Sequence, residues 1–309
     1  MHFPGRFADQ LLAEHLHNVS LSFLVDDLVV RRGGVAANIA FAMAQLGERP
    51  VLVGAVGADF DEYRAWLERH GVDCDSVRVS DVFHTARFVC TTDDEMCQIA
   101  SFYAGAMSEA RLIELEPAVR RTAADLVLVS ADDPAAMLRH SVECRERGYR
   151  FAADPSQQIA RMNGPELVEL IDGAELLFTN EYEKSLLESK TGLSDAEILE
   201  RVGTRVTTLG AKGVEITGRD TAPIHVPVAR EHAKLDPTGV GDGFRAGFLT
   251  ARIWGLSWQR AAEVGSLLAA MVLETVGTQE YEVVPGEFVA RLVESYGDEC
   301  AADIATHLR

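Results

Sequence analysis

A glycine-rich turn followed directly by a carboxylate is the part of this sequence whose residue types and spacing could do chemistry. Gly239 and Gly241 flank Val240, Asp242 follows, and an apolar stretch with helical spacing comes next. A glycine turn that opens a helix points several unpaired backbone N–H groups in one direction, and the helix dipole adds positive potential. Such an arrangement binds anions, and phosphate is the usual one.

Asp242 itself is badly placed to bind phosphate, because the two negative charges repel. It is better placed to accept a proton from a hydroxyl group that attacks the phosphate. The alternative is an ordinary loop in which Asp242 caps the following helix, a common role for aspartate. The glycine-rich turn alone leaves both interpretations open.

Composition excludes several classes of protein. The 309 residues, 47% of them hydrophobic, suit one large α/β domain, and the net charge of −19 argues against a nucleic-acid or anionic-membrane partner. No apolar run approaches the ~18 residues of a membrane span. The N-terminus lacks the basic-then-apolar pattern of a signal peptide. The five cysteines form no CxxC pair, which predicts reduced thiols in a cytoplasmic protein.

Most of the chain alternates between apolar strands and helices, which indicates a mainly parallel sheet covered on both faces. Strands are expected over 50–56, 125–130, 149–153, 175–180 and 205–209, the last followed by a glycine turn and a returning strand at 214–217. Helices are expected near 61–70, over 137–147 and 261–275, and in the tail from Pro285.

The segment 73–104 has a different pattern. Two short strands, 85–91 and 98–103, flank a polar tip and predict a hairpin. A further strand predicted within 19–30 would join this hairpin. The sequence therefore predicts a single α/β domain over 1–309, with a small lid formed by about 19–30 and 80–104.

The run Asp236-Pro237-Thr238-Gly239-Val240-Gly241-Asp242 resembles the C-terminal signature of the ribokinase-like (PfkB) carbohydrate kinases. Further stretches resemble the bacterial, mycobacterial-type adenosine kinases: 3–7, 20–27, 154–158 and 277–280. The resemblance covers nearly the whole chain. It implies a three-layer α/β/α domain with a mainly parallel central sheet and a β-strand lid. It also implies ATP-dependent phosphorylation of the 5′-hydroxyl of adenosine to AMP, a reaction of purine salvage.

The resemblance implies a set of substrate-binding residues. Gly34 and Asn38, at the start of an alanine-rich helix, match the glycine and asparagine that bind ribose hydroxyls in the family; a solvent-facing asparagine is the alternative. Gln157, Gln158 and Arg161 follow a strand, where α/β sheets bind ligands, although glutamines at a helix start are often only solvated. The Arg161 guanidinium suits the transferring phosphate, and the alternative is a contact with a carboxylate.

Phe88 and Phe102 lie in the two predicted lid strands. They could stack on a base, at about 1–3 kcal/mol per base. Equally, they could form the core of the lid, as aromatic residues at strand spacing often do. The family resemblance favours contact with a base.

ATP and magnesium are assigned by resemblance as well. Asn180, Thr208, Gly210 and Gly213 match positions at the ATP site, together with Gly239 and Gly241. Glu183 would help to hold Mg²⁺ through water, since magnesium keeps many of its waters. The alternative for Asn180 and Glu183 is an N-cap with its capping-box glutamate.

Two departures from the family pattern stand out. In the family, a first strand ending in a sugar-binding aspartate precedes the Phe3-Pro4-Gly5 segment, and neither occurs here. Either the start is misassigned or truncated, or part of the sugar site is absent; a missing internal strand would leave two sheet neighbours unpaired. Gly243 stands where the family usually has a small residue such as alanine, and the glycine costs at most ~1 kcal/mol of helix propensity.

The sequence thus predicts a kinase that uses ATP as co-substrate and Mg²⁺ as cofactor, with Asp242 as catalytic base. Backbone N–H groups around Gly239, Val240 and Gly241 would stabilise the transferring phosphate. Dependence on a monovalent cation stays open, and a homodimer through the lid is expected by resemblance. The rival interpretations are a ribose, fructose or other nucleoside kinase, a non-catalytic nucleoside-binding protein, and a poorly folding fragment.

Overall fold

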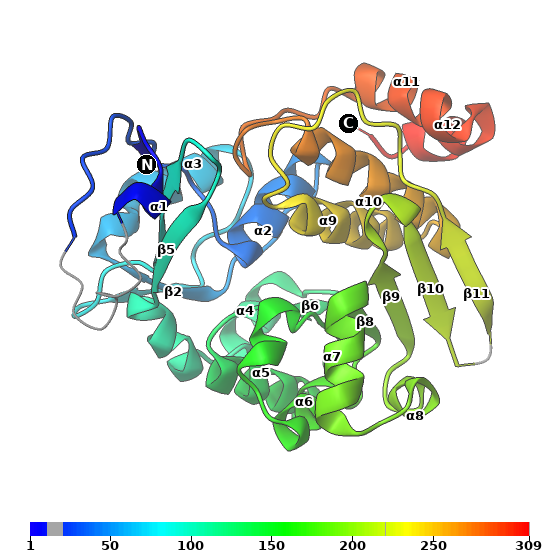
Figure 1. Ribbon diagram of the computed structural model, residues 1–309. Coiled ribbons are helices and arrows are strands. Elements are labelled where there is room, and N and C mark those ends of the chain that lie inside the picture. Colours follow the sequence, from blue (N-terminus) through cyan, green and yellow to red (C-terminus); the bar gives the residue numbers. More distant parts are fainter. Residues whose placement is uncertain (11–20, 220, 309) are drawn as a thin grey trace.

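The computed structural model describes residues 1–10, 21–219 and 221–308, and it is built around a six-stranded sheet with the order β11-β10-β9-β8-β7-β6 (Figure 1). The parallel strands are β6 (Val127–Val129), β7 (Phe151–Ala153), β8 (Leu176–Asn180) and β9 (Thr204–Thr208). Two antiparallel strands, β10 (Val214–Gly218) and β11 (Thr221–Val226), complete the sheet on one side. The predicted mainly parallel sheet is confirmed.

Helices cover both faces of this sheet, because neighbouring residues of its strands point to opposite sides. Leu176 and Phe178 of β8 enter one apolar core, whereas Leu177 enters the other. The first face carries α2 (Val35–Gln45), α9 (Val240–Ile253), α10 (Trp258–Leu273), α11 (Pro285–Tyr296) and α12 (Asp298–Ala305). The second carries α5 (Pro134–Arg147), α6 (Gly164–Ile171), α7 (Glu181–Thr191) and α8 (Asp195–Leu199). The result is a three-layer α/β/α arrangement.

Glycines allow α9 and α10 to pack very closely. A Cβ atom on Gly247 would lie 2.8 Å from the Cα of Gly265, and one on Gly243 would lie 2.8 Å from Val272 Cγ2. Gly243 therefore does more than lower helix propensity, which was the only consequence expected from the sequence. It lets the first turn of α9 approach the helix behind it.

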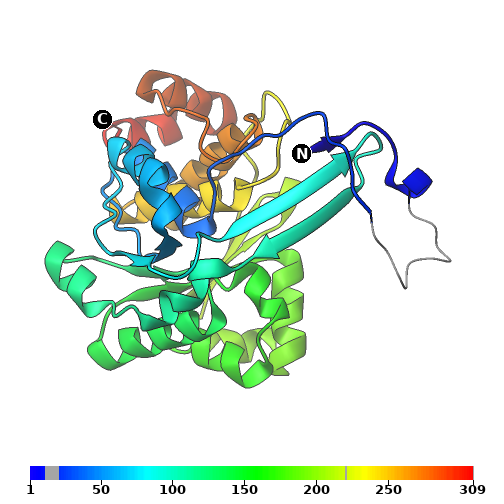
Figure 2. The same cartoon turned by 90° about the vertical axis from the view of Figure 1, so that its left-hand side faces the viewer.

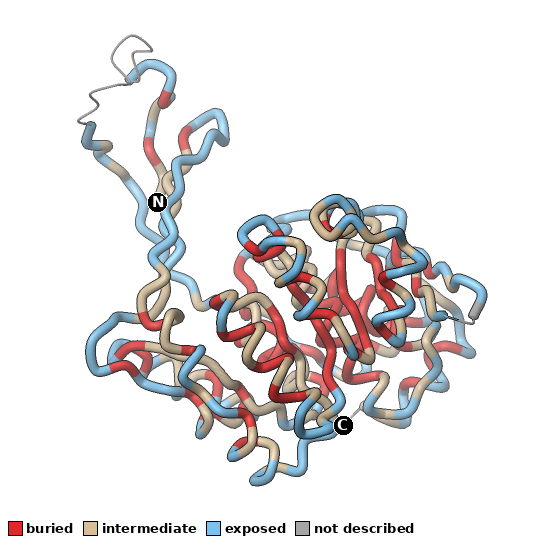
Figure 3. Tube along the Cα trace, turned by 90° about the horizontal axis from the view of Figure 1, so that it is seen from below, coloured by how far each residue is buried: buried red, intermediate tan, exposed pale blue. Residues whose placement is uncertain are grey.

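A small sheet stands apart from the three layers (Figure 2). It has the order β1-β4-β5 and consists of β1 (His2–Phe3), β4 (Arg87–Asp93) and β5 (Gln98–Tyr103). The predicted hairpin is confirmed. Figure 3 shows it projecting from the main body as a largely exposed arm, while the central strands are buried.

The strand predicted within 19–30 is wrong for the part that the structure describes. Residues 21–30 contribute a single antiparallel bridge, between Asp27 and His2, and residues 19–20 lie outside the described ranges. The physical reason is that β1 occupies the free edge of β4: His2 pairs with Thr92, and the Thr92 N–H donates to the Met1 carbonyl at 3.0 Å.

A second small sheet links the hairpin to the core. β2 (Gly54–Gly57) and β3 (Val77–Ser80) pair in parallel beside α3 (Asp61–Arg69). Asp59, just after β2, accepts hydrogen bonds from Thr85 Oγ1 at 2.6 Å and Arg87 Nη2 at 2.7 Å, which fixes the base of the hairpin. Among the described residues, β6 pairs only with β7, and β2 pairs only with β3.

The remaining elements are short. They are α1 (Phe7–Gln10), α4 (Glu116–Thr122) and the 3₁₀ turns η2 (Ala58–Phe60), η3 (Gly105–Leu112), η4 (Ser156–Ala160) and η5 (Gly210–Lys212). Within the described residues, no helix combines the length and apolar character needed to cross a membrane.

Candidate active site

The start of α9 differs from the simplest sequence interpretation. Gly239 is its N-cap, with a left-handed φ of 80°, and no side chain caps the helix. Asp242 is the third residue of α9, so the interpretation of Asp242 as the N-cap is wrong. The turn before the helix is shaped instead by Asp236, whose Oδ1 accepts from the Thr238 N–H at 2.9 Å.

The backbone N–H groups at this helix start are available to a ligand. The Val240 N–H has only a long contact of 3.4 Å to the Pro237 carbonyl. Within the described part of the chain, the N–H groups of Gly241 and Asp242 have no hydrogen-bond acceptor. Unpaired N–H groups and the helix dipole are the two features that the predicted anion-binding arrangement needs.

Both glycines of the turn are required by close contacts. A Cβ atom on Gly239 would lie 2.8 Å from Thr278 Cγ2, and its φ of 80° also disfavours other residues. A Cβ atom on Gly241 would lie 2.9 Å from Arg245 Nη1. The turn therefore depends on glycine for its shape as well as for ligand access.

Asp242 is a partly buried carboxylate whose environment makes it a better base. Burial raises the pKa of Asp242 to about 6. A hydrogen bond from Asn38 Nδ2, at 2.8 Å from Asp242 Oδ2, and the charge of Arg245 act in the opposite direction, while Asp154 raises the pKa further. The carboxyl group is thus mainly ionised at neutral pH, with a basicity closer to the working pH than that of an exposed aspartate.

A buried ion pair lies behind the helix start and was not predicted from the sequence. Arg245 Nε is 2.6 Å from Asp154 Oδ2, with side-chain exposures of 7% and 0%. Arg245 Nη1 also donates to the Gly241 carbonyl at 3.1 Å. Burial lowers the pKa of Arg245, but the charges of Asp154, Glu183 and Asp242 outweigh it and raise that pKa overall. The pair joins the end of β7 to the glycine-rich turn.

The segment around Gly34 and Asn38 lies next to Asp242, at the start of α9. Gly34 is the N-cap of α2, with a φ of 106°, as the two glycines before the helix indicated. Asn38 is buried, so its interpretation as a solvent-facing asparagine is wrong. Its amide contacts Asp242 directly, and its Oδ1 accepts from Thr278 and Gln279.

The two lid phenylalanines are not part of a lid core. Phe88 and Phe102 are 68% and 54% exposed, and they lie directly opposite each other on neighbouring strands. Residues directly opposite in a strand pair share one face of the hairpin. The two rings are therefore available to a ligand, and contact with a base stays a prediction.

The glutamines after β7 lie in the 3₁₀ turn η4 rather than at the start of an α-helix. Gln158 is buried, with no partner for its Oε1 in the described structure, whereas Gln157 and Arg161 are exposed. Simple solvation is therefore wrong for Gln158 and stays open for Gln157.

Asn180 and Thr208 are register partners at the ends of β8 and β9. Asn180 and Glu183 form the capping box of α7: the Glu183 N–H donates to Asn180 Oδ1 at 2.7 Å, and the Asn180 N–H donates to Glu183 Oε2 at 2.8 Å. Burial raises the pKa of Glu183. The structural alternative is therefore present, and Glu183 Oε1 takes no part in the capping box.

The glycine turn after β9 follows its sequence prediction. Gly210 and Gly213 have φ values of 58° and 100°, and a Cβ atom on Gly213 would overlap the Val226 carbonyl. Within the described ranges, no group of three or more metal-binding side chains could hold an ion. Glu183 alone fits a magnesium ion that is held mainly by phosphates and water and that contacts the carboxylate through a water molecule.

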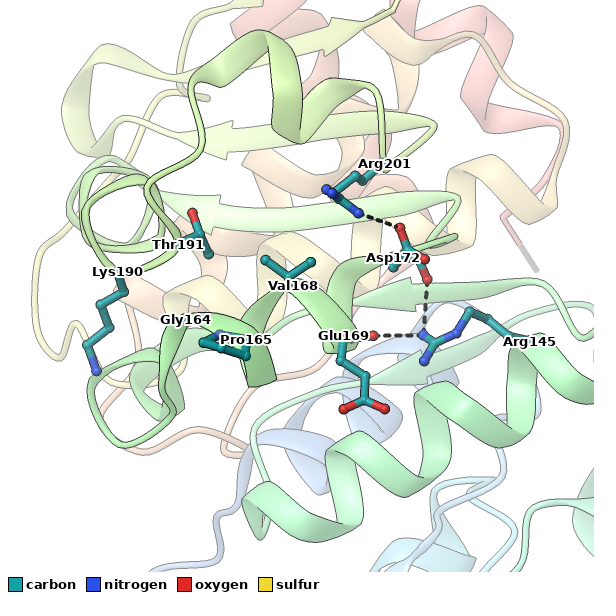
Figure 4. A pocket seen from close by; sticks show the side chains of 9 residues that line it. All are labelled: Arg145, Gly164, Pro165, Val168, Glu169, Asp172, Lys190, Thr191 and Arg201. Atoms are coloured by element: carbon teal, nitrogen blue, oxygen red, sulfur yellow. Dashed lines mark hydrogen bonds and ion pairs between the residues drawn. The ribbon is translucent and has the colours of Figure 1, made fainter.

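A separate surface hollow lies between α5, α6 and α7 (Figure 4). Its cations are already engaged: Arg145 Nη1 donates to the carbonyls of Glu169 and Asp172, and Arg201 pairs with the Asp172 carboxylate at 3.2 Å. None of the predicted site residues lines it.

Comparison with known proteins identifies the family. The model of the pfkB family carbohydrate kinases matches residues 8–283. A nucleoside kinase of Methanothermobacter thermautotrophicus is 34% identical, with 86% of each chain covered. A ribokinase of Haemophilus influenzae is 24% identical over 80% of this chain and 82% of its own length.

A solved structure has the same architecture. The Burkholderia thailandensis nucleoside kinase in complex with inosine has a TM-score of 0.84 and 33% identity, covering 96% of this chain and 94% of that one. The sheet with helices on both faces is therefore the ribokinase-like fold. With the glycine-rich turn, Asp242 in the first turn of α9 and the family match over most of its length, this chain belongs to the pfkB family of carbohydrate kinases.

Proposed function

We propose that this protein transfers the γ-phosphate of ATP to the 5′-hydroxyl of adenosine, giving AMP and ADP. The observation that carries the proposal is Asp242, a partly buried carboxylate with a raised pKa in the first turn of α9, beside unpaired backbone N–H groups. The relatives that are nucleoside kinases support a nucleoside acceptor. Adenosine is the narrower part of the proposal and rests on the sequence stretches that resemble adenosine kinases.

In the proposed reaction, Asp242 accepts the proton of the 5′-hydroxyl as the hydroxyl oxygen attacks the γ-phosphorus. The bond from that phosphorus to the β–γ bridging oxygen breaks, and ADP leaves. Backbone N–H groups at Gly239, Val240 and Gly241 would stabilise the charge on the transferring phosphate; losing one such donor typically lowers kcat about 10²- to 10³-fold. The proton on Asp242 then returns to solvent.

The remaining roles follow the same scheme. Gly34, Asn38, Gln157, Gln158, Arg161, Phe88 and Phe102 are proposed to contact adenosine, and Asn180, Thr208, Gly210 and Gly213 to contact ATP. Mg²⁺, when bound, neutralises charge on the ATP phosphates, and Glu183 would hold it through water. Closure of the lid hairpin would exclude water from the reacting groups.

We also propose a homodimer formed through the lid. Every residue of β5 is exposed, and β5 is the last strand of its sheet in the described structure. An exposed edge strand readily pairs with another chain.

A cytoplasmic location is proposed because all five cysteines are free thiols and ATP is the co-substrate.

The test is ATP consumption and product formation with adenosine, inosine, ribose and fructose as acceptors. The proposal expects AMP and the highest kcat/KM with adenosine. A preference for ribose or fructose would identify a sugar kinase. Binding of adenosine without any phosphorylated product would identify a non-catalytic nucleoside-binding protein and contradict the proposed role of Asp242.

A further inference from the structure

The segment Gly277–Glu280 resembles a family stretch, but the proposed reaction assigns it no role. In the structure, two of its side chains converge on Asn38. Thr278 Oγ1 is 2.9 Å and Gln279 Nε2 is 3.0 Å from Asn38 Oδ1, and Asn38 Nδ2 in turn donates to Asp242. Asn38, Thr278 and Gln279 are 6%, 8% and 1% exposed, so water does not compete for these contacts.

The chemistry of Trp66 fixes the direction of this chain of hydrogen bonds. An indole N–H can only donate. Trp66 Nε1 lies 3.1 Å from one end of the Gln279 amide, so that end must be the oxygen, Oε1. The nitrogen of Gln279 then faces Asn38, and only the oxygen of the Asn38 amide can accept from it. The nitrogen of Asn38 is thereby turned toward Asp242.

The reverse orientation of Asn38 would place its oxygen against the Asp242 carboxylate, where two acceptors repel. An asparagine amide can rotate by half a turn at little cost in shape, so a neighbouring group has to select the orientation. Tyr63 supports Gln279 on the other side, because its hydroxyl accepts from Gln279 Nε2 and donates to the Gly33 carbonyl at 3.0 Å.

We propose that Gln279, oriented by Trp66, is a positioning residue for Asp242: it fixes the Asn38 amide so that an N–H, and not the oxygen, faces the carboxylate. This inference rests on the proposed role of Asp242 as general base. It assigns a function to the Gly277–Glu280 stretch. It also assigns one to Trp66, which lies on α3, far away in the sequence.

The consequence for chemistry is electrostatic. Burial raises the pKa of Asp242, and the hydrogen bond from Asn38 is the largest influence that lowers it. The charged and titratable groups that act on Asp242 are Arg245 on the same helix, Asp154 after β7 and Tyr281 beyond the 277–280 stretch. Loss of the correctly oriented amide would leave the carboxylate with Arg245 as its main support and a higher pKa.

Two substitutions at Gln279 separate orientation from packing. Methionine has a similar volume but no N–H, so Gln279→Met removes one of the two donors to Asn38 Oδ1, leaves only Thr278, and weakens the selection of the amide orientation. Glutamate can still accept from Trp66, but Gln279→Glu offers only oxygen to Asn38 and therefore favours the reversed amide. Gln45→Met is the matched control, because Gln45 Oε1 accepts from the Val283 N–H at 3.2 Å and has no contact with Asn38 or Asp242.

The first readout is the pH profile of kcat/KM with adenosine and ATP. The acid limb reports the ionisation of the base in the free enzyme. We expect its midpoint to move upward by about 1 pH unit in Gln279→Met. In Gln279→Glu it should move further, and in Gln45→Met it should stay in place. Equal profiles for all four proteins, or equal shifts for Gln279→Met and Gln45→Met, would overturn the proposal.

The second readout needs no activity. Because the folded-state pKa of Asp242 is raised above its usual value, its contribution to stability falls as pH rises through that pKa. A further increase in this pKa makes the loss of unfolding free energy between pH 5 and pH 8 larger. We expect that larger loss in Gln279→Met, and we expect the difference to vanish when both proteins also carry Asp242→Asn.

The two readouts distinguish failure of this proposal from failure of the proposed function. A difference in pH-dependent stability that persists in the Asp242→Asn background would contradict the positioning role, whatever the activity. A difference that vanishes there, in a protein that phosphorylates none of the acceptors, would support the positioning of Asp242 and contradict the kinase assignment.

Discussion

Helices α7 and α9 both begin near the carboxyl ends of the central strands, but their N-termini are built in opposite ways. In α7, Asn180 and Glu183 satisfy each other's backbone N–H groups in a capping box. In α9, Gly239 occupies the cap position, no side chain caps the helix, and Asp242 points to Asn38 instead. A self-capped helix start is stable without a ligand, whereas an uncapped one has N–H groups to offer to phosphate.

The charged groups at the two helix starts are also connected. Arg245 links the two regions: it pairs with Asp154, donates to the Gly241 carbonyl and lowers the pKa of Glu183. Burial raises the pKa of both Asp242 and Glu183. A single buried cation thus contacts the glycine-rich turn on one side and acts through its charge on Glu183 of the capping box on the other.

Apart from the loss of Asp242 itself, the largest effect is expected from damage to the uncapped start of α9. In Gly241→Ala, the new Cβ would lie 2.9 Å from Arg245 Nη1, which the buried ion pair prevents from moving away easily. The displaced turn should lower kcat about 10²-fold, because small misplacements of catalytic groups have effects of this size. The measurement is steady-state kinetics with adenosine and ATP.

Gly286→Ala is the control for this substitution. Gly286 is the second residue of α11, as Gly241 is of α9, and a Cβ there would meet nothing within 4 Å. We expect unchanged kcat and a small gain in stability from helix propensity. Equal kinetics for the two variants would show that the α9 turn has no special role.

A smaller effect is expected at the capped start of α7. Asn180→Ala removes the cap and should lower the unfolding free energy by about 1 kcal/mol. Asn180→Ser keeps a good capping hydroxyl but loses the amide. If Asn180 also contacts ATP, the serine variant should keep most of the stability and show a raised KM for ATP.

Asn163→Ala provides the matched control, since Asn163 and Glu166 form the same capping box at the start of α6. It should lose stability as Asn180→Ala does and keep its KM for ATP. A normal KM for ATP in Asn180→Ser would restrict Asn180 to a structural role.

The smallest effect is expected at Gly243. In Gly243→Ala, helix propensity gains about 1 kcal/mol, but the new methyl group would lie 2.8 Å from Val272 Cγ2 on α10. Overpacking typically costs about 1–3 kcal/mol, so a small net destabilisation follows. Thermal unfolding should register it, with kcat close to wild type. A clear increase in stability would mean that α10 shifts enough to accommodate the added methyl group.

Local patterns predicted much of this architecture. The alternation of apolar strands and helices predicted the layered sheet, and the glycines before α2 and α9 predicted both helix starts. The predicted strand within 19–30 is wrong over 21–30 because β1 takes its place beside β4, and such competition between distant segments leaves no local signal.

The site was predicted less completely than the fold. Asp242, Asn38 and the glycine turn follow from the motifs, but their mutual contact depends on tertiary structure. Arg245 could have been suspected, because it lies one helical turn after Asp242 and a charged residue in an apolar stripe needs a buried partner. The link from Trp66 to Asn38 spans α3, the 277–280 segment and α2, and nothing in the sequence joins them.

The most direct test of this account is Asp242→Asn. Asparagine can still accept from Asn38 but cannot accept the hydroxyl proton, so kcat should fall about 10²- to 10⁴-fold with little change in the KM for ATP. At pH 8 the variant should also be more stable than wild type, because a buried charge with a raised pKa has been removed. Full activity in a folded Asp242→Asn protein would contradict the assignment of Asp242 as the base.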